Sequence, residues 1–373
     1  MSTHTLAENA SGDRSQSIHT ISGIDSDSRP ADAPRAYPVE FTGSGSEYFR
    51  IWIVNLLLGI ATLGVYSAWG KVRTQRYLHF NTRIDGASFG YHVRGLSILK
   101  GRAVAVLLFV AYLVLTREMQ ATGLAITALG AVIVLPWLLY RSLRFRLANT
   151  SYRGLRFGFQ GPLWKSYIVF ALYPILTLAT LYLLTPFTHR AIKSYQHNHS
   201  TYGDARFSFH GKTADFYIAY LLWLVLVAAL AGLPAFAFWR LAAGSPEPGV
   251  QGPDLFAMGW VWAYAVLVCC APVLAASLRN LIWNATALGP HRVISRVSRW
   301  KYLYIFVTNG ILVVLTLGLF TPFAKIRRLR YVASRTTLVA AGSIEEFVAG
   351  RQDAGVGAAG DETADIFGID IAL

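Results

Sequence analysis

Asparagine and threonine side chains recur inside long apolar blocks of this chain, and they are the residues there whose types could do chemistry. The candidates for a polar path are Asn55, Thr62, Thr180, Asn309 and Thr316. Amide and hydroxyl groups in an apolar medium can coordinate a solute or line a wet path. The same groups can instead satisfy backbone groups that a helix break frees, and can form bonds between helices. The sequence alone leaves both interpretations open.

Basic residues that follow these blocks make a second candidate site. This candidate cytoplasmic basic surface consists of Lys71, Arg73, Arg76, Arg144, Arg146, Arg327 and Arg330. Converging cations of this kind attract a soluble anion. Alternatively, they fix the orientation of the chain and bind anionic lipid headgroups, at about 1 kcal/mol for each Lys or Arg near the surface. We expect anionic lipid headgroups as partners and no nucleic acid, because a bilayer already accounts for basic residues beside apolar blocks.

The elements that must position these residues are membrane helices. With 54% hydrophobic and 14% charged residues, the chain is more apolar than a soluble protein, which has about 25% charged residues. Its mean hydropathy of +0.41 agrees with this. Apolar stretches of about 20 residues can cross a bilayer. The apolar blocks lie near residues 49–69, 103–115, 123–140, 167–187, 216–239, 256–278 and 302–323.

Positive charge is concentrated in the middle of the chain. The net charge is +14, to which residues 1–48 contribute −4 and residues 345–373 contribute −6. Residues 49–344 therefore carry +24. Residues 1–37 are polar and contain no apolar segment of the kind that a signal peptide needs, so we expect a disordered tail there.

Three of the apolar blocks end in a shared pattern, which indicates internal repeats. Residues 62–73, 180–190 and 316–327 each begin with Thr-Leu, pass an aromatic residue and end in basic residues. Several basic stretches then run into a polar turn and alternating aromatic residues such as Phe157 and Phe159, a period of two that favours short strands. We therefore expect an all-α polytopic membrane protein built from internal repeats, with short β-like aromatic segments in its cytoplasmic connectors. The expected parts are a disordered tail (1–37), a membrane domain (38–344) with repeat blocks near 41–91, 157–209 and 296–342 and helical hairpins at 103–140 and 216–278, and an acidic C-terminal tail (345–373).

The positions of the basic residues favour one topology. If all seven blocks cross once, the 30 basic residues of the middle region divide 19 to 11 between the two faces, a poor fit to the positive-inside rule. If the three Thr-Leu blocks instead dip in and return at their central breakers Asn55, Pro174 and Asn309, only Arg117 and Arg240 face the far side and the division is 28 to 2. We prefer this re-entrant, multi-pass arrangement with cytoplasmic basic connectors. The alternative is straight spans that the breakers only kink.

One motif resembles a known family. The resemblance rests on Thr-Leu-Gly-Val-Tyr-Ser-Ala-Trp-Gly-Lys-Val-Arg at 62–73, Asn-Thr at 81–82, Asp-Gly at 85–86 and Phe-Thr-Gly at 41–43. These segments are similar to the YjgN-like family of bacterial inner-membrane proteins, which carries a domain-of-unknown-function label. The resemblance extends from about residue 38 to the end of the chain. It implies a polytopic protein of the bacterial inner membrane and carries over no activity, cofactor or functional residue.

Residue types for catalysis or metal binding do not assemble in the sequence. Cys269 and Cys270 are adjacent inside an apolar block and indicate packing, and the four histidines between residues 189 and 210 have no spacing typical of metal ligands. No acidic residue lies within an apolar block, which disfavours a carboxylate relay. We therefore expect no enzyme, no cofactor and no metal site. Permeation or transport of a small solute or anion is the expected function, and a non-catalytic membrane scaffold or anionic-lipid-interacting protein is the alternative. The oligomeric state is left open.

Overall fold

Short strands join in one closed antiparallel barrel. The computed structural model describes residues 34–243, 252–342, 344, 347 and 348. Its strands are β1 (Pro34–Phe41), β2 (Thr82–Ile84), β3 (Ala87–Tyr91), β4 (Thr150–Tyr152), β5 (Leu155–Phe159), β6 (Ser200–Tyr202), β7 (Ala205–Phe209), β8 (Thr286–Leu288), β9 (His291–Ser295) and β10 (Thr336–Ala341). Neighbours pair in the order β1-β10-β9-β8-β7-β6-β5-β4-β3-β2, and β2 pairs β1. Closure leaves the barrel without an exposed edge strand.

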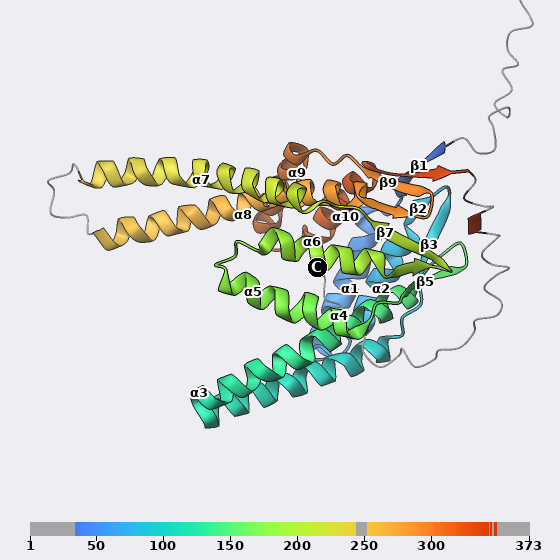
Figure 1. Cartoon of the computed structure of the whole chain (residues 1–373), viewed down its shortest axis with the longest axis horizontal. Coiled ribbons are helices and arrows are strands. Elements are labelled where there is room, and N and C mark those ends of the chain that lie inside the picture. Colours follow the sequence, from blue (N-terminus) through green and yellow to red (C-terminus); the bar gives the residue numbers. More distant parts are fainter. Residues whose placement is uncertain (1–33, 244–251, 343, 345–346, 349–373) are drawn as a thin grey trace, which may run out of the picture.

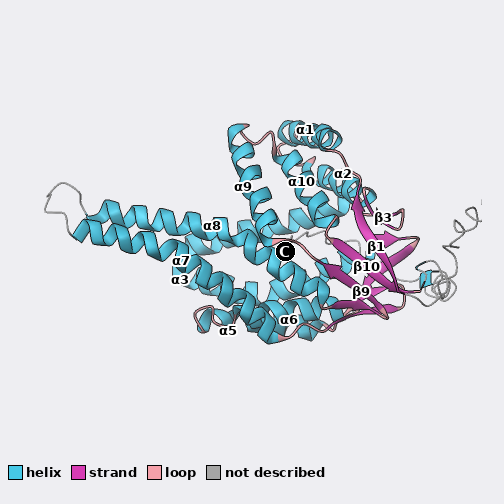
Figure 2. Cartoon of the chain, turned by 90° about the horizontal axis from the view of Figure 1, so that it is seen from above, coloured by secondary structure: helices cyan, strands magenta, loops and turns pink. Residues whose placement is uncertain are grey.

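Helical hairpins connect the strands. The helices are α1 (Gly45–Ala61), α2 (Ser67–Phe80), α3 (Gly95–Ala148), α4 (Leu163–Tyr167), the π-helix η1 (Ile168–Leu172), α5 (Tyr173–Ala179), α6 (Thr185–Asn198), α7 (Thr213–Ala243), α8 (Gly252–Asn284), α9 (Arg299–Leu315) and α10 (Thr321–Ala333). Five times the chain leaves the barrel from one strand, runs through a helical hairpin and returns in the next strand. All the hairpins extend from the same side of the barrel (Figures 1 and 2).

The barrel corrects the expectation of an all-α protein. The aromatic connector segments are strands, but they belong to one continuous sheet rather than to separate connectors. A strand such as β2, with three residues, is too short for a period of two to be recognised. The closing pair joins Pro34 to Ala341, nearly the whole described chain apart, and such a long-range pairing leaves no local signal.

Both ends of the described chain contribute to the barrel. The expected disordered tail (1–37) is too long by four residues, because β1 begins at Pro34; residues 1–33 lie outside the described residues. Most of the expected acidic tail also lies outside them. The apolar cluster of the barrel also includes Ile344, Phe347 and Val348. The Phe347 ring packs edge-on against the His291 ring, with 4.3 Å between the ring centroids. Residues just after β10 therefore cover part of the barrel interior.

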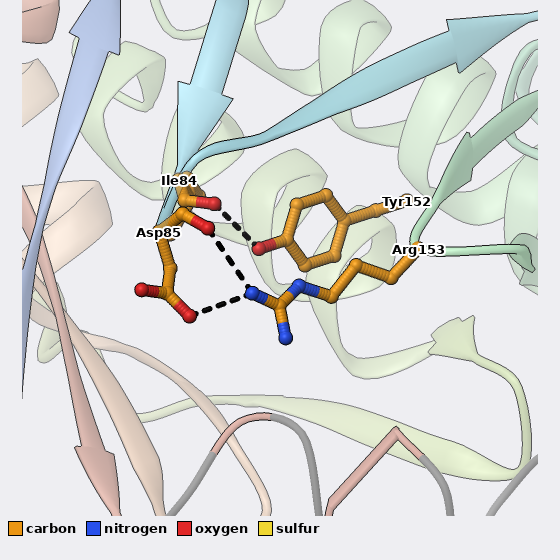
Figure 3. A network of polar contacts seen from close by, with 4 residues as sticks. All are labelled: Ile84, Asp85, Tyr152 and Arg153. Carbon is orange, nitrogen blue, oxygen red and sulfur yellow. Dashed lines mark hydrogen bonds and ion pairs between the residues drawn. The ribbon is translucent and has the colours of Figure 1, made fainter.

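Aromatic side chains fill the barrel. Tyr152 and Tyr202 are buried in a cluster to which nearly every strand contributes, and Phe157 lies 4.9 Å from Tyr202 between ring centroids. The Tyr202 hydroxyl donates to the carbonyl of Tyr152 at 2.9 Å, and the Tyr152 hydroxyl donates to the carbonyl of Ile84 at 2.8 Å. Figure 3 shows the second bond beside the ion pair of Arg153 with Asp85, at 2.6 Å. These bonds connect the β2–β3, β4–β5 and β6–β7 hairpins in series.

The three Thr-Leu blocks form short helical hairpins that reverse at their Thr-Leu turns. The expected reversal at the central breakers Asn55, Pro174 and Asn309 is wrong, because all three lie within helical segments. The chain turns instead through residues with positive φ, namely Leu63 (48°), Leu181 (50°) and Leu317 (50°) with the residue after each. Gly64 and Gly318, which follow Leu63 and Leu317, also have positive φ, a conformation that glycine adopts without steric cost because it has no Cβ.

The other two hairpins are longer. α3 reverses at Gln120, where φ is 44°, and its two arms run side by side (Figure 1). α7 packs along α8, and the Trp223 indole donates to the carbonyl of Cys270 at 3.0 Å. Among the described residues, three helical segments are long and apolar enough to cross a membrane: Gly95–Ala148, Thr213–Pro234 and Gly259–Asn284.

Candidate functional site

The two candidate asparagines hold the arms of their own hairpins together. The Asn55 amide donates to the carbonyl of Gly70 at 3.1 Å, from α1 to α2. At the matching place in α9, Asn309 donates to the carbonyl of Ala324 at 3.2 Å. Arg327 then donates to the Asn309 side-chain oxygen at 3.1 Å. Each asparagine therefore hydrogen-bonds the two antiparallel helices of its own hairpin to each other, and we call this bond a clamp.

The candidate threonines stabilise the hairpin turns. Thr62, Thr180 and Thr316 each donate to the carbonyl four residues earlier, at 2.7 to 2.8 Å. The Thr62 and Thr316 hydroxyls also accept from the backbone N–H four residues later, at 2.9 and 3.0 Å. The five polar-path candidates are thus bonded within their own hairpins, and none of them lines the large cavity described below.

The candidate basic surface is divided among several places. Arg76 donates to the carbonyl of Val93 at 3.2 Å, and Arg330 donates to that of Gly43 at 2.9 Å, so both fix loops that lead from a strand into a helix. Lys71 and Arg144 are half-buried on α2 and α3, and Arg73 is exposed beside Arg76. Arg327 bonds to α9, as described above. Of the seven residues, Arg146 lines the large cavity.

A cavity of about 890 Å³ lies between three hairpins on the helical side of the barrel. Its walls come from the second arm of α3, from η1 and α6, and from α7 and α8; α6 lies between α3 and the α7–α8 pair (Figure 1). Phe157 and Phe207 of the barrel interior also line it. The volume is within the range of small-molecule sites, about 300 to 1,000 Å³.

Basic groups gather in this cavity. Arg146, Lys193 and Arg279 come from α3, α6 and α8, and none of the described residues that line the cavity is acidic. The Lys193 amine donates to the Gln196 side chain at 3.2 Å, and the Arg279 guanidinium lies over the Trp283 ring at 5.9 Å. The buried Nε of Arg279 has no hydrogen-bond partner among the described residues. Among the described residues that line the cavity, no carboxylate compensates these cations, and such a set favours an anion.

Burial lowers the pKa values of three basic side chains on α6, namely His189, His197 and Lys193. It lowers the pKa of His189 to about 4 and that of His197 to about 4, with a smaller contribution from the positive charge of Lys193. Both imidazoles are therefore neutral at neutral pH, and their Nδ1 atoms lie 3.0 Å from the Tyr220 hydroxyl and 3.1 Å from that of Thr286. Burial, and then the charge of Arg146, lower the pKa of Lys193. A bound anion would favour the protonated amine.

Sequence reasoning missed Lys193 and Arg279. Both belong to basic stretches that precede a strand, which is a signal present in the sequence. The basic residues that the sequence singles out as candidates lie at or after the ends of the first and third Thr-Leu blocks, or just before β4. Within the described residues, no group of three His, Cys, Asp or Glu side chains is arranged to hold a metal ion.

Comparison with known proteins gives the family. A family model described as "Bacterial protein of unknown function (DUF898)" matches residues 36–366. Inner membrane protein YjgN of Salmonella typhimurium strain LT2 is 30% identical over 145 residues, which are 39% of this chain and 36% of that protein. YjgN of Escherichia coli K12 is 33% identical over 120 residues, 32% of this chain and 30% of that protein.

The alignments thus span about a third of the length of these curated relatives. No solved structure matches the chain significantly. The family model, by contrast, covers most of the sequence. The chain therefore belongs to the DUF898 family of bacterial proteins, the YjgN-like family that its 62–73 motif resembles.

Proposed function

We propose that this chain is a multi-pass protein of the bacterial inner membrane that takes an anionic solute into the basic cavity between α3, α6 and α8, as a step of permeation or transport. The observation that carries the proposal is the meeting of Arg146, Lys193 and Arg279 around one cavity without an acidic lining residue in the described chain. The relatives' names, inner membrane proteins, support the location. In this proposal the cavity binds and passes the anion without changing it chemically.

In this proposal the long hairpins cross the bilayer and the short ones re-enter. α7 and α8 have 31 and 33 residues, more than the 20 or so that span the hydrocarbon core. In the first short hairpin, no charged residue lies between Arg50 and the turn at Leu63. That arm measures roughly 18 Å at the rise of an α-helix, about half the hydrocarbon thickness. The tip leucines Leu63, Leu181 and Leu317 are 96%, 84% and 95% exposed, which suits contact with lipid tails.

The barrel and the basic connectors then face the cytoplasm. Every helical hairpin returns to the barrel, so the connectors share one side of the membrane. The concentration of Lys and Arg on that side agrees with the positive-inside rule. Arg117, near the α3 reversal, faces the periplasm in this arrangement.

Cysteine labelling tests this topology. In a chain whose Cys269 and Cys270 are replaced by alanine, Glu118→Cys at the α3 tip reacts with a membrane-impermeant maleimide added to spheroplasts. Pro290→Cys, at the turn between β8 and β9, reacts only after lysis. Leu181→Cys reacts in neither case because the short hairpin ends inside the bilayer. Labelling of Leu181→Cys from the periplasm, measured as a gel shift, would show that the short hairpins cross.

Anion binding tests the function itself. Inorganic phosphate, compared with chloride at equal ionic strength, is expected to raise the melting temperature of the purified full chain, because a ligand that binds the folded state stabilises it. The Lys193→Gln/Arg279→Gln variant loses this shift. Arg141→Gln is the matched control, since the Arg141 guanidinium lies over the Trp137 ring, 5.7 Å from its centroid, and does not line the cavity. An equal shift in both variants contradicts the proposed site.

A further inference from the structure

The basic cavity has two chemically different ends. Near the barrel lie Arg146 and Arg279, four and seven residues before the strands that follow them. At the other end, α8 contributes Leu267 and Ala271, and α7 contributes Trp223. Twelve residues of helix separate Leu267 from Arg279, which is roughly 18 Å along α8. The cavity is therefore cationic at the barrel and apolar toward the membrane.

Open space continues along α8 between these two ends. Leu267 is 42% exposed, and Ala271 and Ala275 are also exposed, although all three line a cavity between helices. A residue in a packed helical core would be covered by its neighbours. Leu267, Ala271 and Ala275 thus form an uncovered stripe on α8, called the α8 stripe. It leads from the membrane end of the cavity to the cations, so an elongated ligand can lie along it.

The length of the stripe corresponds to one leaflet of a bilayer. Half of a hydrocarbon core of about 30 Å is about 15 Å, close to the distance from Leu267 to Arg279. A soluble anion would need only the cationic end. The apolar end, with Trp223 and Leu267, offers burial to an acyl chain and nothing to a small hydrophilic ion.

We propose that the ligand of the cavity is an anionic phospholipid, with its phosphate between Arg146, Lys193 and Arg279 and an acyl chain along the α8 stripe toward Leu267. The inference rests on the proposed function, because it names the anion that the same cavity takes. Arginine guanidinium groups and a lysine amine are the usual partners of phosphate oxygens. The orientation follows from the charge: the headgroup lies on the barrel side, which is the cytoplasmic side of the proposed topology.

The test measures equilibrium binding of radiolabelled phosphatidylglycerol to the purified full chain in phosphatidylcholine mixed micelles, beside an arm with inorganic phosphate. Each of Lys193→Gln and Arg279→Gln is expected to weaken lipid binding about tenfold, the loss of one charge-assisted hydrogen bond. Both variants should fold, because each removes one of several mutually repelling cations. Arg141→Gln again serves as the matched charge control.

A second variant separates the lipid from a free anion. Ala271→Trp fills the apolar end and is expected to abolish phosphatidylglycerol binding while inorganic phosphate binds as in the wild type. If phosphate binds but phosphatidylglycerol does not, or if Ala271→Trp leaves lipid binding unchanged, the lipid inference falls and the proposed anion site stands. If neither probe binds the wild type, both fall. Equal losses in Arg141→Gln and Lys193→Gln would show that the lipid binds the basic surface at large, which also overturns the inference.

Discussion

Replacing Tyr202 by alanine is expected to lower the free energy of unfolding by about 3 to 5 kcal/mol, the usual cost of removing a large buried aromatic side chain. Tyr202 is 4% exposed at the centre of the barrel cluster, and its ring contacts those of Tyr152 and Phe157. Since the barrel is closed, neighbouring strands cannot move inward independently to fill the cavity that is left. The measurement is reversible unfolding of the purified chain in mixed detergent micelles.

The Tyr202→Phe variant separates the packing from the hydrogen bond. It keeps the ring and removes only the hydroxyl that donates to Tyr152, at a cost of about 1 kcal/mol. The expected order is wild type, then Tyr202→Phe, then Tyr202→Ala with a much larger loss. Equal stability of the two variants would mean that the ring does not pack in the barrel as described.

How much of the barrel could be predicted from the sequence depends on which contacts are local. The Asp85-Gly86 turn lies between two strands of a local hairpin, and both residues have positive φ, as an Asp-Gly signal predicts. Pairing of β1 with β10 is different, because Pro34 and Ala341 meet only when all the helical hairpins have assembled. Alternating aromatics marked the strands, and nothing in their period indicated that they share one sheet.

The sequence shows the basic stretches that supply the cavity residues, but not that these residues line one cavity. Arg146 was among the expected basic residues, and Lys193 and Arg279 lie in similar basic stretches. The sequence shows that each of the three precedes a strand. They line one cavity because the barrel brings the ends of α3, α6 and α8 together. In the same way, the sequence marks Asn55 and Asn309 as unusual in apolar helices, but their partners Gly70 and Ala324 depend on where each hairpin reverses.

Replacing Asn309 by leucine is the second variant with a large expected effect, a loss of about 3 kcal/mol of unfolding free energy. The substitution removes the amide that donates to Ala324 and also the acceptor of Arg327, which is left with the Thr308 hydroxyl at 2.8 Å and the Tyr304 ring. Loss of a hydrogen-bond acceptor costs more folding free energy for a partly buried guanidinium than for a neutral donor. Unfolding in mixed micelles measures the loss.

Asn55→Leu is the matched control, because it removes the same clamp from the first hairpin but exposes no cation. The Asn55 side-chain oxygen has no partner among the described residues, so only its donated bonds are lost and the expected cost is about 1 kcal/mol. Adding Arg327→Leu to Asn309→Leu should restore most of the stability, since the guanidinium that lost its acceptor is then gone. If Asn309→Leu instead left stability unchanged and abolished phosphate binding, Asn309 would belong to a solute path rather than to a clamp between helices.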